Sequence, residues 1–135
     1  MAETTSFERL PLRKDGDILY MRQMVRERIV AIGFRMLDTT KLLTAASELG
    51  RNVLVHGGGG AVVLETVTVA GRVGLRMTFE DEGPGIPDMA LAMTDGYTSG
   101  GGMGLGLSGS KRLVDDFDIT SEVGKGTRVC VTKWK

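Results

Sequence analysis

Residues 55–81 read VHGGGGAVVLETVTVAGRVGLRMTFED, and within this stretch the chain changes from a helical pattern to a β pattern. Before the glycine run at 57–60, apolar residues recur every three to four positions, which is the period of one helix face. After it, the β-branched run 61–69 and the run 73–79 flank Gly71, which predicts two strands joined as a hairpin. The glycine run therefore separates a helical part of the chain from a β part.

Two helices are expected before that boundary. The first begins with Asp17 as its N-cap and ends at Gly33, because short polar side chains cap helix starts and glycine follows helix ends. The second is capped by Asp38, Thr39 or Thr40 and stops near the glycine run. The apolar stripes of these helices consist of Ile18, Met21, Val25, Ile29 and Ile32, and of Leu42, Ala45, Ala46, Leu49 and Val53.

The rest of the chain predicts a turn, a loop, a helix and further strands. Residues 81–87 hold the Asp, Gly and Pro residues that form turns, and 88–103 have no sustained period, which indicates a long loop. We expect a helix over 104–114 and a closing hairpin over 119–134, with a short edge strand over 7–12. Strands with helices on one side give an α+β two-layer sandwich.

Composition limits the class of protein. The 135 residues fit a single domain, 1–135, and 17 basic residues balance 17 acidic ones, which argues against a highly basic nucleic-acid binder. One cysteine allows no intramolecular disulfide. No signal pattern and no run of about 18 apolar residues is present, so we expect a cytoplasmic protein without a membrane span. Glycine is the outlier, with 20 residues.

Glu48 and Asn52 form the first candidate constellation. They lie four residues apart on the second expected helix, so their side chains leave the same face. The simpler interpretation is a solvated helix face. The functional one gives Asn52 an amide oxygen for a hard cation and Glu48 a carboxylate that accepts a proton; Mg²⁺ commonly takes few protein oxygens and completes its shell with phosphates and water.

Asp81, Gly83 and Gly85 form the second constellation. An ordinary turn explains them, because Asp and Gly are standard turn residues. Alternatively, Asp81 ends a strand and accepts a hydrogen bond from an exocyclic amine, while the two glycines let a flat ring approach the backbone without a Cβ in its way.

The third constellation is the glycine-rich run Gly100–Gly109, which precedes or opens a helix. Free N–H groups at a helix start favour an anion such as phosphate. A flexible linker would explain the glycines but not the alternation of Met103, Leu105 and Leu107 with them. Gly104–Gly109 also fits the dinucleotide pattern G-x-G-x-x-G, but a glycine-rich loop, not a strand, precedes it.

Two further features have simple interpretations. His56, the single histidine, follows Asn52 by four residues and is interpreted as a polar group at a helix end. Lys133-Trp134-Lys135 is interpreted as a solvated tail.

The order of these motifs is more specific than any one of them. Over residues 15–134 the chain resembles the GHKL ATP-binding superfamily, which includes gyrase, Hsp90, histidine-kinase catalytic domains and anti-sigma-factor kinases. The resemblance lies in the order of the motifs: E-x-x-x-N on a helix, a hairpin, D-x-G-x-G, a loop, G-x-G-x-G opening a helix, and G-x-G-T. SELGRN (47–52), FEDEGPGIPD (79–88) and SKRLVD (110–115) are similar to RsbT-type serine/threonine kinases of the bacterial stressosome. The resemblance implies the Bergerat fold, a layer of helices against a mostly antiparallel or mixed sheet.

The resemblance also implies roles for residues of the helical part. Asn52 holds Mg²⁺, and Glu48 matches the position of the general base. Arg51 matches the arginine of the family's Arg-Asn pair, for which contact with phosphate is suggested. Ser108 stands where close relatives carry proline.

The roles implied for the β part concern ATP. Asp81 accepts from the adenine amine, supported by Thr127, and Gly83 and Gly85 line the adenine pocket. The residues implied to wrap the phosphates are Gly102, Met103, Gly104, Leu105, Gly106 and Leu107.

The function that this resemblance implies is an ATP- and Mg²⁺-dependent protein serine/threonine kinase acting on STAS-domain partners in a stress response. Such a kinase also activates a PP2C-type phosphatase once it is released. The alternatives are an anti-sigma factor that sequesters a sigma subunit, a non-catalytic module whose shape ATP controls, and the catalytic half of a histidine kinase. The last alternative lacks a helical dimerisation segment with a phosphoacceptor histidine, since His56 abuts the glycine run.

Overall fold

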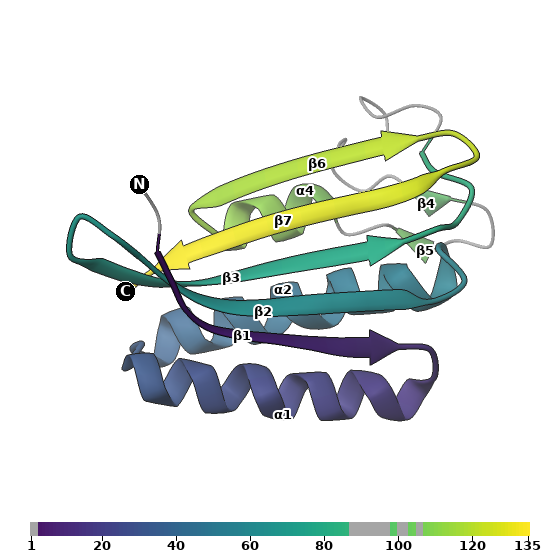
Figure 1. Ribbon diagram of the computed structural model, residues 1–135. Coiled ribbons are helices and arrows are strands. Elements are labelled where there is room, and N and C mark those ends of the chain that lie inside the picture. Colours follow the sequence, from purple (N-terminus) through teal and green to yellow (C-terminus); the bar gives the residue numbers. More distant parts are fainter. Residues whose placement is uncertain (1–2, 87–97, 100–102, 105–106) are drawn as a thin grey trace.

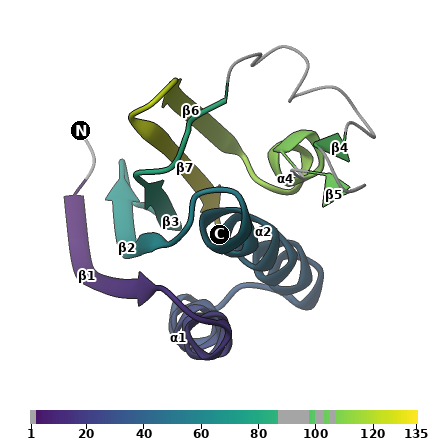
Figure 2. The same ribbon diagram turned by 90° about the vertical axis from the view of Figure 1, so that its right-hand side faces the viewer.

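The computed structural model describes residues 3–86, 98–99, 103–104 and 107–135. A five-stranded sheet forms one layer and the helices form the other, as Figures 1 and 2 show from two directions. The elements are β1 (Glu3–Leu12), α1 (Asp15–Ile32), α2 (Met36–Val55), β2 (Gly60–Val69), β3 (Arg72–Asp81), β4 (Thr98–Ser99), β5 (Met103–Gly104), α4 (Leu107–Leu113), β6 (Asp116–Glu122) and β7 (Gly126–Trp134).

The strand order in the sheet is β1-β2-β3-β7-β6, and every pairing is antiparallel. The expected two-layer α+β sandwich is confirmed. β1 is an edge strand, as Pro11 predicts, because proline cannot donate to a sheet ladder. The β2–β3 hairpin turns through Ala70 and Gly71, whose φ angles are 50° and 82°. Positive φ at both central residues is what a tight two-residue hairpin requires.

The core lies between the sheet and the helices. Both predicted helix stripes face it, because residues three and four apart share one face of a helix. The inner row of β3 consists of alternate residues, since neighbouring side chains of a strand point to opposite faces. The buried residues that build the centre are Met21, Val25, Ile29, Leu42, Leu49, Val53, Val62, Leu64, Leu75, Met77, Phe79, Val129 and Val131.

The expected helix starts are wrong, although the expected ends are confirmed. α1 begins at Asp15 after Lys14, and Asp17 lies inside its first turn. The carboxylate of Asp17 still serves the helix start, because it accepts the backbone N–H groups of Arg13 at 2.8 Å and Lys14 at 3.2 Å. Gly33 follows α1 with a φ of 92°.

α2 begins at Met36 after its N-cap Arg35, so its cap lies three to five residues before the expected capping residues. The hydroxyls of Thr39 and Thr40 donate to the carbonyls of Arg35 and Met36, at 2.9 and 3.2 Å, so they bond backward along the helix instead of capping it. Asp38 lies in the first turn, where a carboxylate is favourable next to the positive end of the helix.

The segments after β3 differ partly from expectation. A short antiparallel pair, β4–β5, lies within the region expected as a loop, and Gly104 belongs to β5 instead of starting a helix. α4 covers Leu107–Leu113, the later part of the expected helix. None of the helices in residues 3–86 and 107–135 combines the length and apolar character that a membrane span requires.

The outer face of the sheet carries a charged cross-strand pair. Arg76 on β3 donates through Nε and Nη2 to the two carboxylate oxygens of Glu65 on β2, at 3.1 and 3.0 Å. The hydrogen bond from Arg76 is the main reason why the pKa of Glu65 lies below its ordinary value.

The C-terminal residues are anchored, so the interpretation as a solvated tail is wrong. Lys133 is only 8% exposed, and its Nζ lies 3.5 Å from Asp38 Oδ1 and 3.7 Å from Asp115 Oδ1. Trp134 donates its backbone N–H to Asp115 at 2.7 Å and its indole N–H to Asp116 at 2.9 Å. The end of β7 thereby connects the start of α2 with the turn after α4.

We expect Lys133→Ala to lower the free energy of unfolding by roughly 1–3 kcal/mol, because two carboxylates lose their shared cation. Arg128→Ala is the matched control, since its ion pair with Glu80 is about half exposed on both sides, and it should cost at most about 0.5 kcal/mol. Urea unfolding of both variants measures the difference. Equal stabilities of the two variants would contradict a structural role for Lys133.

Candidate functional site

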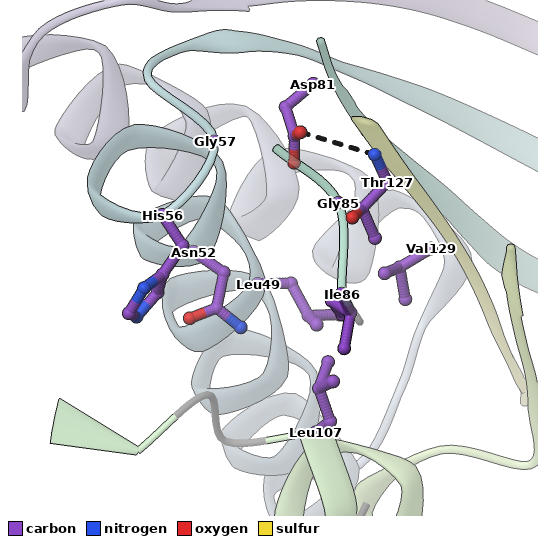
Figure 3. A pocket seen from close by; sticks show the side chains of 10 residues that line it. All are labelled: Leu49, Asn52, His56, Gly57, Asp81, Gly85, Ile86, Leu107, Thr127 and Val129. Carbon is purple, nitrogen blue, oxygen red and sulfur yellow. Dashed lines mark hydrogen bonds between the residues drawn. The ribbon is translucent and has the colours of Figure 1, made fainter. Parts of the chain in front are cut away.

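A pocket lies where α2, the end of β3, the start of β7 and the start of α4 meet (Figure 3). Its wall is mostly apolar, with polar groups supplied by α2 and by the strand ends. This combination suits a flat ring with a few polar edge groups. The lining residues are Leu49, Asn52, His56, Gly57, Asp81, Gly85, Ile86, Leu107, Thr127 and Val129.

Asp81 reaches the pocket because of strand periodicity. It follows Leu75, Met77 and Phe79 as the last residue of the inner row of β3, where the sheet ends and the apolar core gives way to the pocket. Its Oδ1 accepts the backbone N–H groups of Gly83 at 2.9 Å and Thr127 at 3.3 Å. Among the described residues both bonds go to Oδ1, so the carboxylate is oriented and Oδ2 can accept from a ligand.

The glycines after Asp81 allow close contact within the protein itself. A Cβ on Gly83 would lie 2.7 Å from the Cα of Gly57, and a Cβ on Gly85 would lie 2.4 Å from the carbonyl oxygen of Glu122. Gly85 also has a φ of +79°, which side chains disfavour. Of the two predicted glycines, Gly85 lines the pocket and Gly83 packs behind it against Gly57.

α2 presents Glu48 and Asn52 on successive turns, and His56 follows one turn later as its C-cap residue. Asn52 and His56 line the pocket (Figure 3), whereas Glu48 is exposed and lies outside the lining. The structure therefore brings Asn52 together with Asp81 and Thr127, and leaves Glu48 accessible to a second molecule. His56 lines the pocket, and its Nε2 is buried and has no hydrogen-bond partner among the described residues.

The glycine-rich run is described in part. Leu107 is the first residue of α4, is buried and lines the pocket. Met103 and Gly104 form β5. The predicted phosphate-wrapping residues Gly102, Leu105 and Gly106 lie outside the described residues.

Residues 3–86 and 107–135 hold no cluster of three or more His, Cys, Asp or Glu side chains that could bind a metal ion by themselves. Asn52 contributes an amide group, with one neutral oxygen, to the residues that line the pocket. This donor set fits an ion that takes most of its ligands from phosphate and water, which is the usual pattern for Mg²⁺ at a nucleotide.

The sequence of this chain matches one known protein family over most of its length. The sequence model described as "Histidine kinase-, DNA gyrase B-, and HSP90-like ATPase" matches residues 37–135, which include all the pocket residues. The chain belongs to this ATPase family. Membership implies the use of ATP and confirms the expected GHKL resemblance.

Individual relatives span nearly the whole chain. The chain is 42% identical over 120 residues to the serine/threonine-protein kinase RsbT of Bacillus subtilis, covering 89% of this chain and 90% of the relative. It is 30% identical to the anti-sigma F factor of Geobacillus kaustophilus, covering 84% and 82%. The expected similarity to RsbT-type kinases is confirmed.

A solved structure supports the fold. The crystal structure of the RsbU and RsbW domains of Rv1364c from Mycobacterium tuberculosis matches with a TM-score of 0.61 at 20% identity. The match covers 97% of this chain and 33% of that one, so this chain spans about a third of the solved protein.

Several lining residues were not predicted from the sequence. Leu49 and Val129 were assignable only to the core, and Ile86 lay within the expected turn segment 81–87 without a functional signal of its own. Gly57 was one of four consecutive glycines, and nothing in the sequence distinguishes the one that packs against Asp81. His56 was placed at a helix end, which is confirmed, but its contribution to the pocket was not foreseen.

We expect Asp81→Asn to weaken ATP binding by about tenfold to a hundredfold, as measured by calorimetry. The amide oxygen can still accept from Gly83 and Thr127, but the amide NH₂ then meets the amine of adenine, and a hydrogen bond to a charged group is lost. Glu80→Gln is the control, because Glu80 lies on the outer face of the same strand. Unchanged ATP affinity of Asp81→Asn would contradict the assignment.

Proposed function

We propose that this chain is a protein serine/threonine kinase that transfers the γ-phosphoryl group of ATP to STAS-domain partners in a bacterial stress-response partner-switching pathway. The observation that carries the proposal is the 42% identity to a serine/threonine-protein kinase over nine-tenths of both chains. The pocket supports it, because the family's nucleotide-binding positions converge there with Glu48 one helical turn away.

The proposed arrangement of ATP follows from the chemistry of the lining. The adenine lies between Leu49, Ile86 and Val129, with its amine directed to Asp81 and to Thr127. The phosphates then extend toward Asn52 and the start of α4, where Gly102–Leu107 would enclose them. Asn52 would hold Mg²⁺, which neutralises phosphate charge when it is bound.

Glu48 is the proposed general base. The partner's hydroxyl oxygen forms a bond to the γ-phosphorus while the bond from that phosphorus to the β,γ-bridging oxygen breaks, and ADP leaves. The proton of the hydroxyl passes to Glu48. Exposure of Glu48 supports this role, since the acceptor is a side chain of another protein that must reach the carboxylate.

We expect Glu48→Gln to retain ATP affinity while phosphotransfer to a STAS partner falls by about 10²–10⁴-fold, the usual contribution of a general base. Single-turnover transfer of labelled phosphate, with mass mapping of the acceptor, measures the rate. Thr44→Ala, an exposed change one turn earlier on α2, should transfer at the wild-type rate. A Glu48→Gln variant as fast as wild type would rule out the base assignment.

We expect Asn52→Ala to remove most of the Mg²⁺ dependence of ATP binding, because the ion loses its amide ligand. The readout is the ratio of ATP dissociation constants with and without Mg²⁺, which should approach one in the variant. Retention of the wild-type ratio would show that another residue holds the ion.

A second candidate is an anti-sigma factor that sequesters a sigma subunit, favoured by 30% identity to an anti-sigma F factor over more than four-fifths of both chains. Pull-down against a STAS protein, a sigma factor and a PP2C-type phosphatase separates the two candidates, because the kinase should bind the STAS protein and the anti-sigma factor should bind the sigma factor. We also propose that the phosphatase binds the chain after its release from the STAS partner. If the Glu48→Gln variant bound every partner in the same ATP-dependent way as the wild type, we would interpret the chain as a non-catalytic module whose shape ATP controls, and not as a kinase. We propose a cytoplasmic location for either candidate.

A further inference from the structure

We propose that Ser121 is a specificity-determining residue of the pocket, because its hydroxyl makes Thr127 a hydrogen-bond acceptor toward the base and so favours amino-purines over keto-purines. Ser121 does not line the pocket and acts through its neighbours. The inference rests on the proposed binding of ATP in this pocket and is independent of phosphotransfer by Glu48.

Ser121 occupies an unusual place on β6. The inner row of this strand continues from Phe117 and Ile119, which pack against the core, to Ser121 at the pocket end. Its register partner on β7 is Thr127. The row thus changes from apolar to polar where β7 enters the pocket, as the row of β3 does at Asp81.

The Ser121 hydroxyl holds the turn that forms one side of the pocket. Its Oγ accepts the backbone N–H of Ile86 at 2.8 Å. Nearby, the N–H of Gly124 donates to the carbonyl of Pro84 at 2.8 Å. These two bonds flank Gly85, whose backbone lies against Glu122, so the β6–β7 end fixes the position of the turn.

The same hydroxyl has two more neighbours, the carbonyl oxygen of Gly126 at 3.2 Å and Thr127 Oγ1 at 2.9 Å. A serine hydroxyl has one proton to donate and two lone pairs to accept with. One lone pair is engaged by Ile86. If Ser121 donates to Gly126, its second lone pair accepts the proton of Thr127, and all three contacts are satisfied.

This arrangement determines what Thr127 offers to the ligand. With its proton committed to Ser121, the Thr127 oxygen faces the pocket as an acceptor, next to the carboxylate of Asp81. Adenine presents an amine to these acceptors. Guanine presents a carbonyl oxygen at the same position, which would leave acceptors facing each other without a hydrogen bond, a costly situation in a buried site.

Ser121→Ala removes the hydroxyl oxygen that accepts the Thr127 proton. The Thr127 hydroxyl can then donate this proton to the carbonyl oxygen of guanine. We expect ATP affinity to fall about tenfold and the ratio of ATP to GTP affinity to shrink about fivefold to tenfold. Ser121→Thr keeps the hydroxyl and should restore most of the ratio. Thr120→Ala, an exposed neighbour on β6, should bind like the wild type.

Calorimetry with ATP and with GTP tests this on the full chain, and Thr127→Val provides a second route if Ser121→Ala does not fold. The valine lacks the acceptor oxygen, so it must reduce the same ratio. An unchanged ratio in the variant that folds, or a wild type that binds GTP as well as ATP, would overturn the proposal. If the wild-type chain prefers ATP to GTP as expected but transfers no phosphate to a partner, that result would instead count against the kinase function.

Discussion

The carboxylate of Asp81 is the contact on which the organisation of the pocket depends. It joins segments that are far apart in the sequence: the turn through Gly83, the start of β7 through Thr127, and the end of α2 through Gly57, whose Cα lies too close for any side chain. Two sheet registers bring these segments together, because Asp81 pairs with Gly60 on β2 and with Thr127 on β7. A shift of one residue in either register would turn the carboxylate away from the pocket.

The sequence predicted the parts of the fold that depend on periodicity. The stripes of α1 and α2 and the hairpin at Gly71 follow from repeated local patterns, and all of them lie as expected. Helix starts were less predictable, because Asp17 accepts N–H groups from inside the first turn and Thr39 bonds backward to the carbonyl of Arg35 instead of capping. Lys133 could not be predicted at all, since its burial depends on Asp38 and Asp115. Those partners are distant in sequence and meet only in the folded chain.

The same distinction holds for the site. Motif order predicted Asn52, Asp81, Gly85, Leu107 and Thr127, and the structure places all of them around one pocket. Ser121 carried no signal, because its phase with Phe117 and Ile119 predicts only that it faces inward, not what its hydroxyl contacts. Its importance comes from three contacts made by one hydroxyl, each with a residue at least five positions away along the chain. Hydrogen-bond capacity can be counted only once the neighbours are known.

The two layers divide the proposed work between them. Base recognition depends on strand ends and the turns between them, where Asp81, Thr127 and Ser121 are held by sheet register. Phosphoryl transfer depends on α2, where Glu48 is exposed and Asn52 lines the pocket. Because Glu48 lies outside the pocket lining, a change at this position can alter transfer while the residues around the pocket stay the same. We infer that a change confined to the exposed face of α2 that carries Glu48 can alter the action on a partner while the pocket lining stays the same.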